Sequence, residues 1–221
     1  LDPAPAAVGR RGAVTALDPQ GKELWTYMVG QYHQAPHVRS VFGARDKDGR
    51  QIVIVGADSW RYYALDAAGK LLWSYESVRA STIGGAADVD GDGVDEIMAG
   101  TEYYSWHLLN RDGTRRFSYS TRGGPTVNAV ASAAFAGGVQ RDVLFGGADG
   151  NVHCLAPGGK LRWLFNTGDE VTGLAVADIN GDGKEELLTG SMSFNVYALD
   201  GEGKALWRQD LGREVSALAL A

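Results

Sequence analysis

The chain has 221 residues and a formal net charge of −6, from 21 basic and 27 acidic residues. No cluster of basic residues favours nucleic acid as a partner, and no apolar run approaches the roughly 18 residues of a membrane-spanning helix. The 31 glycines lack the three-residue period of collagen, so they indicate many tight turns and short strands.

The first recognisable elements belong to a repeat. Residues 13–18 and 22–27 have strand patterns, and they flank the phrase Leu17-Asp18-Pro19-Gln20-Gly21-Lys22-Glu23-Leu24-Trp25. The phrase starts again at Leu65, Leu109, Leu155 and Leu199, at intervals of 48, 44, 46 and 44 residues. This period, with a strand–turn–strand pattern in each copy, predicts an all-β propeller of about five four-stranded blades. We expect residues 1–221 to form a single propeller domain.

The two ends of the chain suggest how the ring closes. Residues 214–221 have the pattern of an innermost strand, whereas residues 13–18 and 22–27 match the third and outermost strands of a blade. A fifth blade would therefore combine both ends, with residues 5–9 as its second strand. The alternative is that the chain is a structural segment of a larger propeller.

Two acidic loops lie between the first and second strands of the second and fourth blades. They are Asp88-Val89-Asp90-Gly91-Asp92-Gly93-Val94-Asp95-Glu96 and Asp178-Ile179-Asn180-Gly181-Asp182-Gly183-Lys184-Glu185-Glu186. Oxygen donors stand at the first, third, fifth and ninth positions, a glycine stands at the sixth, and the seventh residue offers its carbonyl. Such a set of hard donors is typical of calcium sites. The first and third blades lack it, since Ala44 and Ala134 stand at the first position. The alternative is a solvated acidic turn without metal.

These loops resemble the calcium loops of FG-GAP/VCBS, integrin-like propellers. The phrase Ala-Leu-Asp-x-x-Gly-Lys-x-x-Trp resembles the quinoprotein-type (PQQ-like) repeat. The resemblance implies a β-propeller that binds Ca²⁺ through the side chains of Asp88, Asp90, Asp92, Glu96, Asp178, Asn180, Asp182 and Glu186 and the carbonyls of Val94 and Lys184. No residue set for a quinone pocket is recognised. Because calcium is abundant outside cells, we expect an extracellular or periplasmic location.

Aromatic residues mark a second candidate surface. The turns between second and third strands carry Trp60, Tyr103, Tyr104 and Phe194, where the third blade has Gly150. Such side chains would form a stacking platform for sugars or an anchor for a protein partner, or they cap the blade edges. Loops between blades add polar residues nearby, namely His33, His37, Arg39, Arg79 and Arg122.

Three hypotheses follow for function. The first is a calcium-stabilised, non-catalytic recognition module for a glycan or a protein, monomeric or weakly oligomeric. The second is a polysaccharide lyase, or part of one, with a base from His33 or His37 and Arg39 as charge neutraliser. The third is the segment of a larger ring. No nucleophile elbow, phosphate loop or zinc spacing is found. His107 and His153 align with Tyr63 and Tyr197, so we expect them to be packing residues.

Overall fold

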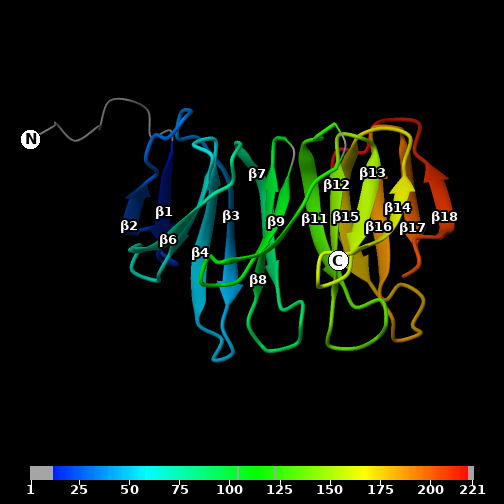
Figure 1. Cartoon of the computed structure of the whole chain (residues 1–221), viewed down its shortest axis with the longest axis horizontal. Helices are drawn as coiled ribbons and strands as arrows, with labels where there is room; N and C mark the ends of the chain where they lie inside the picture. The colour runs from blue at the N-terminus through cyan, green and yellow to red at the C-terminus, as the bar shows by residue number, and fades with distance from the viewer. Residues whose placement is uncertain (1–11, 104, 122, 219–221) are drawn as a thin grey trace, which may run out of the picture.

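A computed structural model describes residues 12–103, 105–121 and 123–218, and every regular element in it is a β-strand (Figure 1). A two-stranded terminal sheet comprises β1 (Ala13–Leu17) and β2 (Glu23–Met28). Blade 1 comprises β3 (Val38–Arg45), β4 (Gln51–Ala57), β5 (Arg61–Leu65) and β6 (Leu71–Glu76). Blade 2 comprises β7 (Ser81–Ala87), β8 (Glu96–Thr101), β9 (Trp106–Leu109) and β10 (Arg115–Tyr119). Blade 3 comprises β11 (Val127–Ala133), β12 (Asp142–Gly147), β13 (Asn151–Leu155) and β14 (Leu161–Asn166). Blade 4 comprises β15 (Val171–Ala177), β16 (Glu186–Ser191), β17 (Asn195–Leu199) and β18 (Ala205–Asp210).

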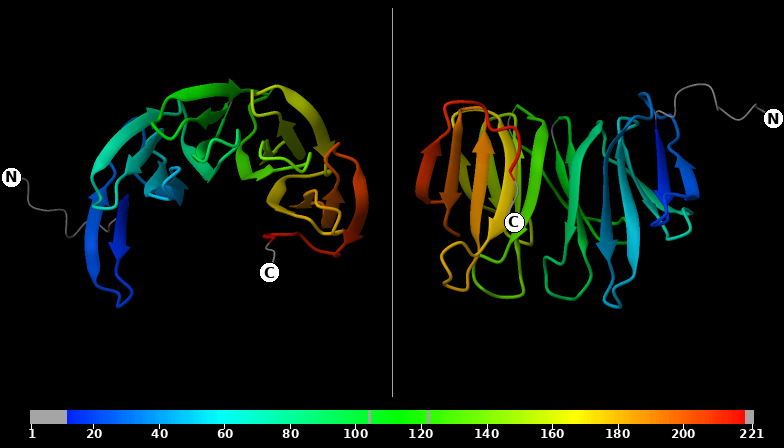
Figure 2. Two further views of the ribbon diagram at one scale, coloured as in Figure 1. Left: turned by 90° about the horizontal axis from the view of Figure 1, so that it is seen from below. Right: turned by 180° about the vertical axis from the view of Figure 1, so that it is seen from behind.

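Each blade is an antiparallel meander, and the five sheets stand side by side in an arc (Figure 2). The first strand of each blade lies on the inner side of the arc, where neighbouring sheets come closest. Glycine allows that approach: a Cβ atom on Gly84 of β7 would lie 2.4 Å from the ring of Phe42 in β3. The small residues of the inner strands therefore set the curvature of the arc. The β-propeller class predicted from the repeat is confirmed.

The expected joining of the two ends is not formed among the described residues. β1 and β2 pair only with each other, and Figure 2 shows the terminal sheet and blade 4 at opposite ends of an open arc. The expected second strand, at residues 5–9, lies outside the described residues. Val215 follows the inner edge of blade 4, where its amide bonds the carbonyl of Ser191 at 3.3 Å. The contacts between neighbouring blades fix their relative rotation, and five sheets at that rotation leave the ends apart.

The repeat phrase forms a latch between neighbouring blades. Its aspartate caps the turn: Asp66 Oδ1 accepts hydrogen bonds from the amides of Ala68 and Lys70, both at 2.9 Å. In three of the five copies the tryptophan reaches the next blade, and Trp73 Nε1 donates to the carbonyl of Arg111 at 2.9 Å. The third copy has Phe117 in place of the tryptophan. Trp25 and Trp163 donate in the same way to the carbonyls of Ala67 and Gly201, both at 3.0 Å.

The glycine of the phrase receives the ring of that tryptophan. Gly113 has a φ of 85°, which disfavours any side chain, and a Cβ there would lie 2.6 Å from Trp73 Cδ2. The two ends of the arc lack this contact. Trp207 is 44% exposed, and a Cβ on Gly21 would meet nothing within 4 Å. The Trp–Gly contact is therefore a contact between blades, and it stops where the arc stops.

The hydrophobic core is divided among the interfaces between sheets. Between blades 2 and 3, Trp106 of β9 is 1% exposed and stacks on Phe145 of β12, with ring centroids 5.5 Å apart. At the equivalent place in blade 1, Tyr62 is fully buried, and its hydroxyl donates to the carbonyl of Gly100 in blade 2 at 2.7 Å. In blades 1 and 2, third-strand rings thus bind the blade to its successor, whereas the equivalent residues of blades 3 and 4 are Val152 and Val196.

Candidate metal centres

The first acidic loop connects β7 to β8 at the lower edge of the sheets in Figure 1. Its backbone wraps around the carboxylate of Asp88, which accepts hydrogen bonds from the amides of Gly91 at 2.7 Å and Gly93 at 2.8 Å. Asp92 Oδ1 accepts one from the amide of Val94 at 2.8 Å. Gly91 and Gly93 have φ values of 84° and 86°, which the tight path of the loop requires.

The second acidic loop, between β15 and β16, repeats this arrangement with different residues. The carboxylate of Asp178 accepts hydrogen bonds from the amides of Gly181 at 2.6 Å and Gly183 at 2.9 Å. Asp182 Oδ1 accepts one from the amide of Lys184 at 2.8 Å. The amide of Gly183 is the main cause that lowers the pKa of Asp178, so the carboxylate is held in its charged form.

The ninth residue of each loop is a buried glutamate. Glu96 and Glu186 are 3% and 4% exposed. Glu96 accepts a hydrogen bond from the amide of Val89 at 3.0 Å, and Glu186 accepts one from Ile179 at 2.9 Å. Burial raises the pKa of Glu96 to about 7, against the opposing effect of the Val89 amide. In the first loop, carboxylate oxygens of Asp88, Asp90 and Glu96 all lie within 4.8 Å of one another.

This donor set fits a calcium ion. The first, third, fifth and ninth side chains of each loop offer hard oxygens, and the backbone amides already orient the first and fifth residues. The holders would be the side-chain oxygens of the first, third, fifth and ninth residues, together with the carbonyl of Val94 or Lys184. A cation there would offset the repulsion among the carboxylates and fix the end of an inner strand.

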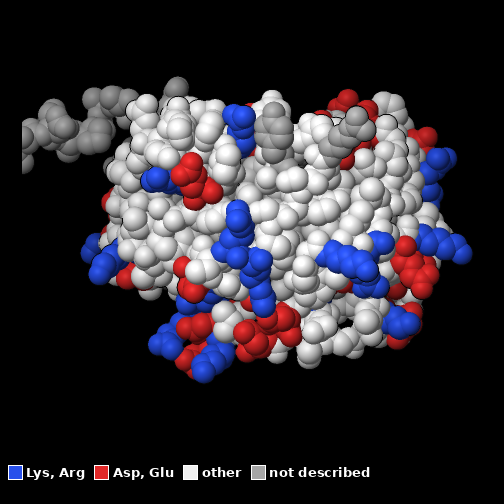
Figure 3. Space-filling view, viewed as in Figure 1, with Lys and Arg blue, Asp and Glu red and all other residues white. Residues whose placement is uncertain are grey.

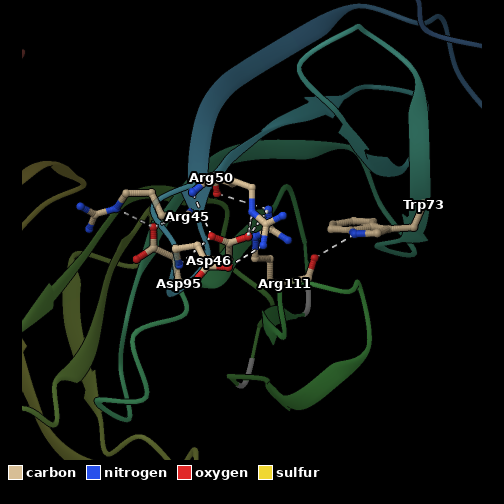
Figure 4. Close-up of polar contacts among 7 residues, drawn as sticks. Arg45, Asp46, Arg50, Trp73, Asp95 and Arg111 are labelled. Atoms are coloured by element: carbon tan, nitrogen blue, oxygen red, sulfur yellow. Dashed lines mark hydrogen bonds and ion pairs between the residues drawn. The ribbon is translucent and has the colours of Figure 1, made fainter.

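The acid at the eighth loop position accepts a hydrogen bond from a backbone amide of the preceding blade, a contact that we call a clasp. The sequence did not reveal this role. Asp95 Oδ2 accepts a hydrogen bond from the amide of Arg45 in blade 1 at 2.7 Å (Figure 4). Glu185 Oε2 accepts one from the amide of Ala134 in blade 3 at 2.6 Å. These two carboxylates therefore join blades and are not free to act as metal ligands. Their only sequence signal is a second acid directly before the ninth residue.

Blade 1 replaces the loop with a tight turn whose acids are neutralised by arginines. Asp46 Oδ1 accepts hydrogen bonds from the amides of Asp48 at 3.0 Å and Arg50 at 2.9 Å. The guanidinium of Arg50 pairs with Asp46 at 3.2 Å and with Asp48 at 2.5 Å, and Arg111 lies against the same turn (Figure 4). Figure 3 shows charged side chains of both signs gathered along this lower edge.

The aromatic turns lie at the opposite edge of the blades, because antiparallel strands alternate their turns between the two edges (Figure 1). Trp60 and Phe194 have φ values of 64° and 70°, at the position where Gly150 has 75°. An aromatic residue in this left-handed region is strained. Phe194 is 46% exposed and Tyr103 is 47% exposed. Tyr104 and Arg122 lie outside the described residues.

Among the described residues, these aromatic side chains are not gathered into one ring. Trp60 stacks with His33, with ring centroids 4.3 Å apart, and the guanidinium carbon of Arg79 lies 5.1 Å from the Trp60 ring. Phe194 lies on blade 4, at the far end of the arc. The turn of blade 1 thus has a compact aromatic and cationic cluster, defined by Tyr32, His33, Trp60, Arg61 and Arg79.

The loop residue Arg39 lines a hollow of about 380 Å³ that also borders Asp58, Glu102, Thr126 and Asn128. Asp58 accepts a hydrogen bond from Arg39 Nε at 2.6 Å and lies 3.2 Å from His37 Nδ1. The side chain of Arg39 is 57% exposed, and two acids balance its charge. The lining also includes the apolar residues Ala80, Ile83 and Val127. The hollow therefore combines polar groups of mixed charge with apolar surface, which suits an uncharged ligand with hydroxyl or amide groups better than a polyanion.

The remaining two histidines are packing residues, as expected. His107 and His153 are each 2% exposed. Burial lowers the pKa of His107 to about 4, so the ring is neutral near pH 7. His153 stacks on Phe145, with ring centroids 4.3 Å apart.

Sequence comparisons place the chain among repeat propellers. Residues 10–183 match the model of the PQQ_2 family, described as outer membrane protein assembly factor BamB. Residues 171–205, which include the second acidic loop, match the FG-GAP repeat. A comparison with curated protein sequences finds no match. No helix among the described residues is long and apolar enough to cross a membrane.

Solved structures share the fold at low sequence identity. BBS1N in complex with ARL6DN, soaked with mercury, has a TM-score of 0.72 and 11% identity, covering 95% of this chain and 64% of that chain. The lead-soaked crystal of that complex has a TM-score of 0.71 and 12% identity, with coverage of 95% and 64%. Sqt1 of Saccharomyces cerevisiae has a TM-score of 0.74 and 12% identity, with coverage of 91% and 56%. The chain thus spans less than two thirds of the length of these proteins. On the match over residues 10–183, the chain belongs to the PQQ_2 (BamB-like) family of β-propeller repeat proteins.

Proposed function

We propose that the chain is a calcium-stabilised, non-catalytic recognition module that binds a glycan or a protein at the edge opposite its acidic loops. The observation that carries the proposal is the repeated cradle: in both loops backbone amides hold the first and fifth residues, and a buried glutamate completes the set. Calcium bound there would stabilise the blades and leave the opposite edge free for a ligand. We expect the chain to work outside the cytoplasm, where calcium is abundant.

The recognition part of the proposal rests on the backbone strain of two aromatic turn residues. A blade accommodates glycine at this turn position, as Gly150 demonstrates, yet Trp60 and Phe194 occupy it with positive φ values. Such a conformation costs about 1–3 kcal/mol at each residue. Phe194 is about half exposed and Trp60 is partly buried, and aromatic side chains kept at that cost are suited to anchor a ligand. The polar side chains of the hollow beside Arg39 would receive the hydroxyl or amide groups of the ligand.

The lyase hypothesis receives less support from this geometry. His33 is exposed, and its ring packs against that of Trp60 with ring centroids 4.3 Å apart, which gives the imidazole a packing contact in this turn. Arg39 is bonded to Asp58, and Glu102 lines the same hollow, so little positive charge remains to neutralise an acidic sugar. The contact between His37 and Asp58 is the one feature that suits a general base.

Calcium is expected to raise the free energy of unfolding. At a concentration of about 100 times the dissociation constant, each occupied loop adds about 3 kcal/mol, and a chelator reverses the gain. Asp178→Asn should remove much of the gain, because it replaces the carboxylate around which the second loop is wrapped. Asp48→Asn is the matched control, since it changes an acid in a turn without the cradle. Thermal unfolding with calcium and with chelator measures the effect, and an equal response of both variants would contradict the proposal.

Phe194→Gly is expected to separate recognition from folding. Glycine relieves the positive φ, so the stability of the fold should hold or rise by about 1 kcal/mol. Ligand binding should weaken about tenfold if the exposed ring is an anchor. Binding is measured on a glycan array and by capture of protein partners, each with calcium and with chelator. Undiminished binding by a stable variant would remove Phe194 from the recognition surface.

A further inference from the structure

The ninth loop residue faces an equivalent outer-strand position in every blade. Strand pairing places Arg115 opposite Leu109 and Ala205 opposite Leu199, so Arg116 and Leu206 are equivalent. By the same register, Leu72 and Arg162 hold this position in blades 1 and 3. At the start of the second strands, the residues in register with the ninth loop position are Ile52, Glu96, Asp142 and Glu186. The corresponding combinations are Leu72 with Ile52, Arg116 with Glu96, Arg162 with Asp142 and Leu206 with Glu186.

In blades 2 and 3 an arginine neutralises the acid. Arg116 reaches Glu96 Oε1 at 2.9 Å and Asp90 Oδ2 at 2.5 Å, so one guanidinium bridges two of the three clustered carboxylates. Arg162 pairs with Asp142 in the same way in blade 3, which has no acidic loop. An arginine at this position therefore balances a buried acid where no metal site is present.

Blade 4 keeps the acid and loses the arginine. Glu186 is 4% exposed and forms no ion pair with any residue that the structure describes. Its other oxygen accepts a hydrogen bond from Asn180 Nδ2 at 3.0 Å. Leu206 helps to line a cavity of about 450 Å³ that also borders Asn180, Asp182 and Glu186. Two basic residues, Lys184 and the Arg162 that pairs with Asp142, line the same cavity, but neither forms an ion pair with Glu186. A buried carboxylate without an ion-pair partner is costly, so this site favours a cation from solution.

We propose that Arg116 is a built-in counter-cation that makes the first loop the weaker of two calcium sites, so that the second loop fills first. A guanidinium does not deprotonate near neutral pH, so calcium must displace it from Asp90 and Glu96 and break two charge-assisted hydrogen bonds. The inference rests on the proposed function of both loops as calcium sites.

Titration calorimetry of the full chain with Ca²⁺ tests this. Asp178→Asn isolates the first loop, and Asp88→Asn isolates the second. Adding Arg116→Leu to Asp178→Asn should tighten binding at the first loop by about tenfold or more, the equivalent of two lost charged contacts. Adding Leu206→Arg to Asp88→Asn should weaken the second loop by a similar factor. Arg115→Leu is the matched control, because it removes the same charge from the neighbouring position of β10.

A second readout guards against loss of folding. Without calcium, Arg116→Leu should lower the midpoint of thermal unfolding, because Glu96 loses its partner, and calcium should restore it. Arg116→Gln offers a polar variant if the leucine variant fails to fold. The role of Arg116 is overturned if neither Arg116→Leu nor Arg116→Gln tightens calcium binding at the first loop while the second loop still binds calcium in the Asp88→Asn variant. That result would leave the proposed function intact. Absence of calcium binding in the wild type and in all variants overturns this inference together with the proposed function.

Discussion

Gly113→Ala is expected to lower the free energy of unfolding by about 3 kcal/mol. Its φ of 85° imposes about 1–2 kcal/mol on any residue with a Cβ atom. The new Cβ would lie 2.6 Å from Trp73 Cδ2, so the indole must also move away from its bond to the Arg111 carbonyl. Overpacking of this kind adds about 1–3 kcal/mol. Urea unfolding followed by tryptophan fluorescence measures the change.

Gly21→Ala is the control that the repeat itself provides. Gly21 holds the same position in the terminal sheet with a φ of 82°, but a Cβ there meets nothing within 4 Å. The control therefore reports the backbone strain alone, about 1–2 kcal/mol. The difference between the two variants is the contribution of the latch between blades. Equal effects would show that the contact between Trp73 and Gly113 contributes nothing to stability.

Trp106→Ala is expected to cost about 3–5 kcal/mol. The ring is 1% exposed and fills the space between blades 2 and 3, against Phe145 and Phe117. Its Nε1 atom has no hydrogen-bond partner among the described residues, so the loss is one of packing and not of a polar contact. Denaturant unfolding at constant calcium measures the change.

Trp106→Phe distinguishes packing from general disruption. Phenylalanine keeps one ring in the same pocket and loses no hydrogen bond, so its cost should be about half that of alanine or less. If both variants unfolded with the same loss, the stacking on Phe145 would not be the source of the effect.

The fold was predictable from sequence because the same turn and contact residues recur in successive blades. Asp66, Gly69 and Trp73 each have a local reason to stand where they do, namely a turn cap, a positive φ and a contact with the next blade. The two acidic loops were recognisable for the same reason, since the spacing of Asp88 and Asp92 is dictated by hydrogen bonds to the loop's own backbone.

Contacts between distant positions were not predictable in this way. Arg116 lies 26 residues after Asp90, and nothing in the local pattern shows that their side chains meet. The clasp of Asp95 on the amide of Arg45 spans 50 residues and involves a backbone atom, which no sequence pattern marks. The joining of the ends, which the described residues do not show, was hard to predict for a related reason: it depends on the rotation between blades, to which packing contacts such as that of Gly84 with Phe42 contribute.

The latches and clasps also determine how the molecule shares its stability. Each one joins a blade only to its immediate neighbour, as Trp73 with Arg111 and Glu185 with Ala134 illustrate. The arc is therefore a one-dimensional array, in which the total free energy is a sum over blades and nearest-neighbour interfaces. Unfolding that begins at either end of the arc therefore crosses one interface between blades at a time. A cation bound in blade 2 or blade 4 would stabilise mainly the interface next to it.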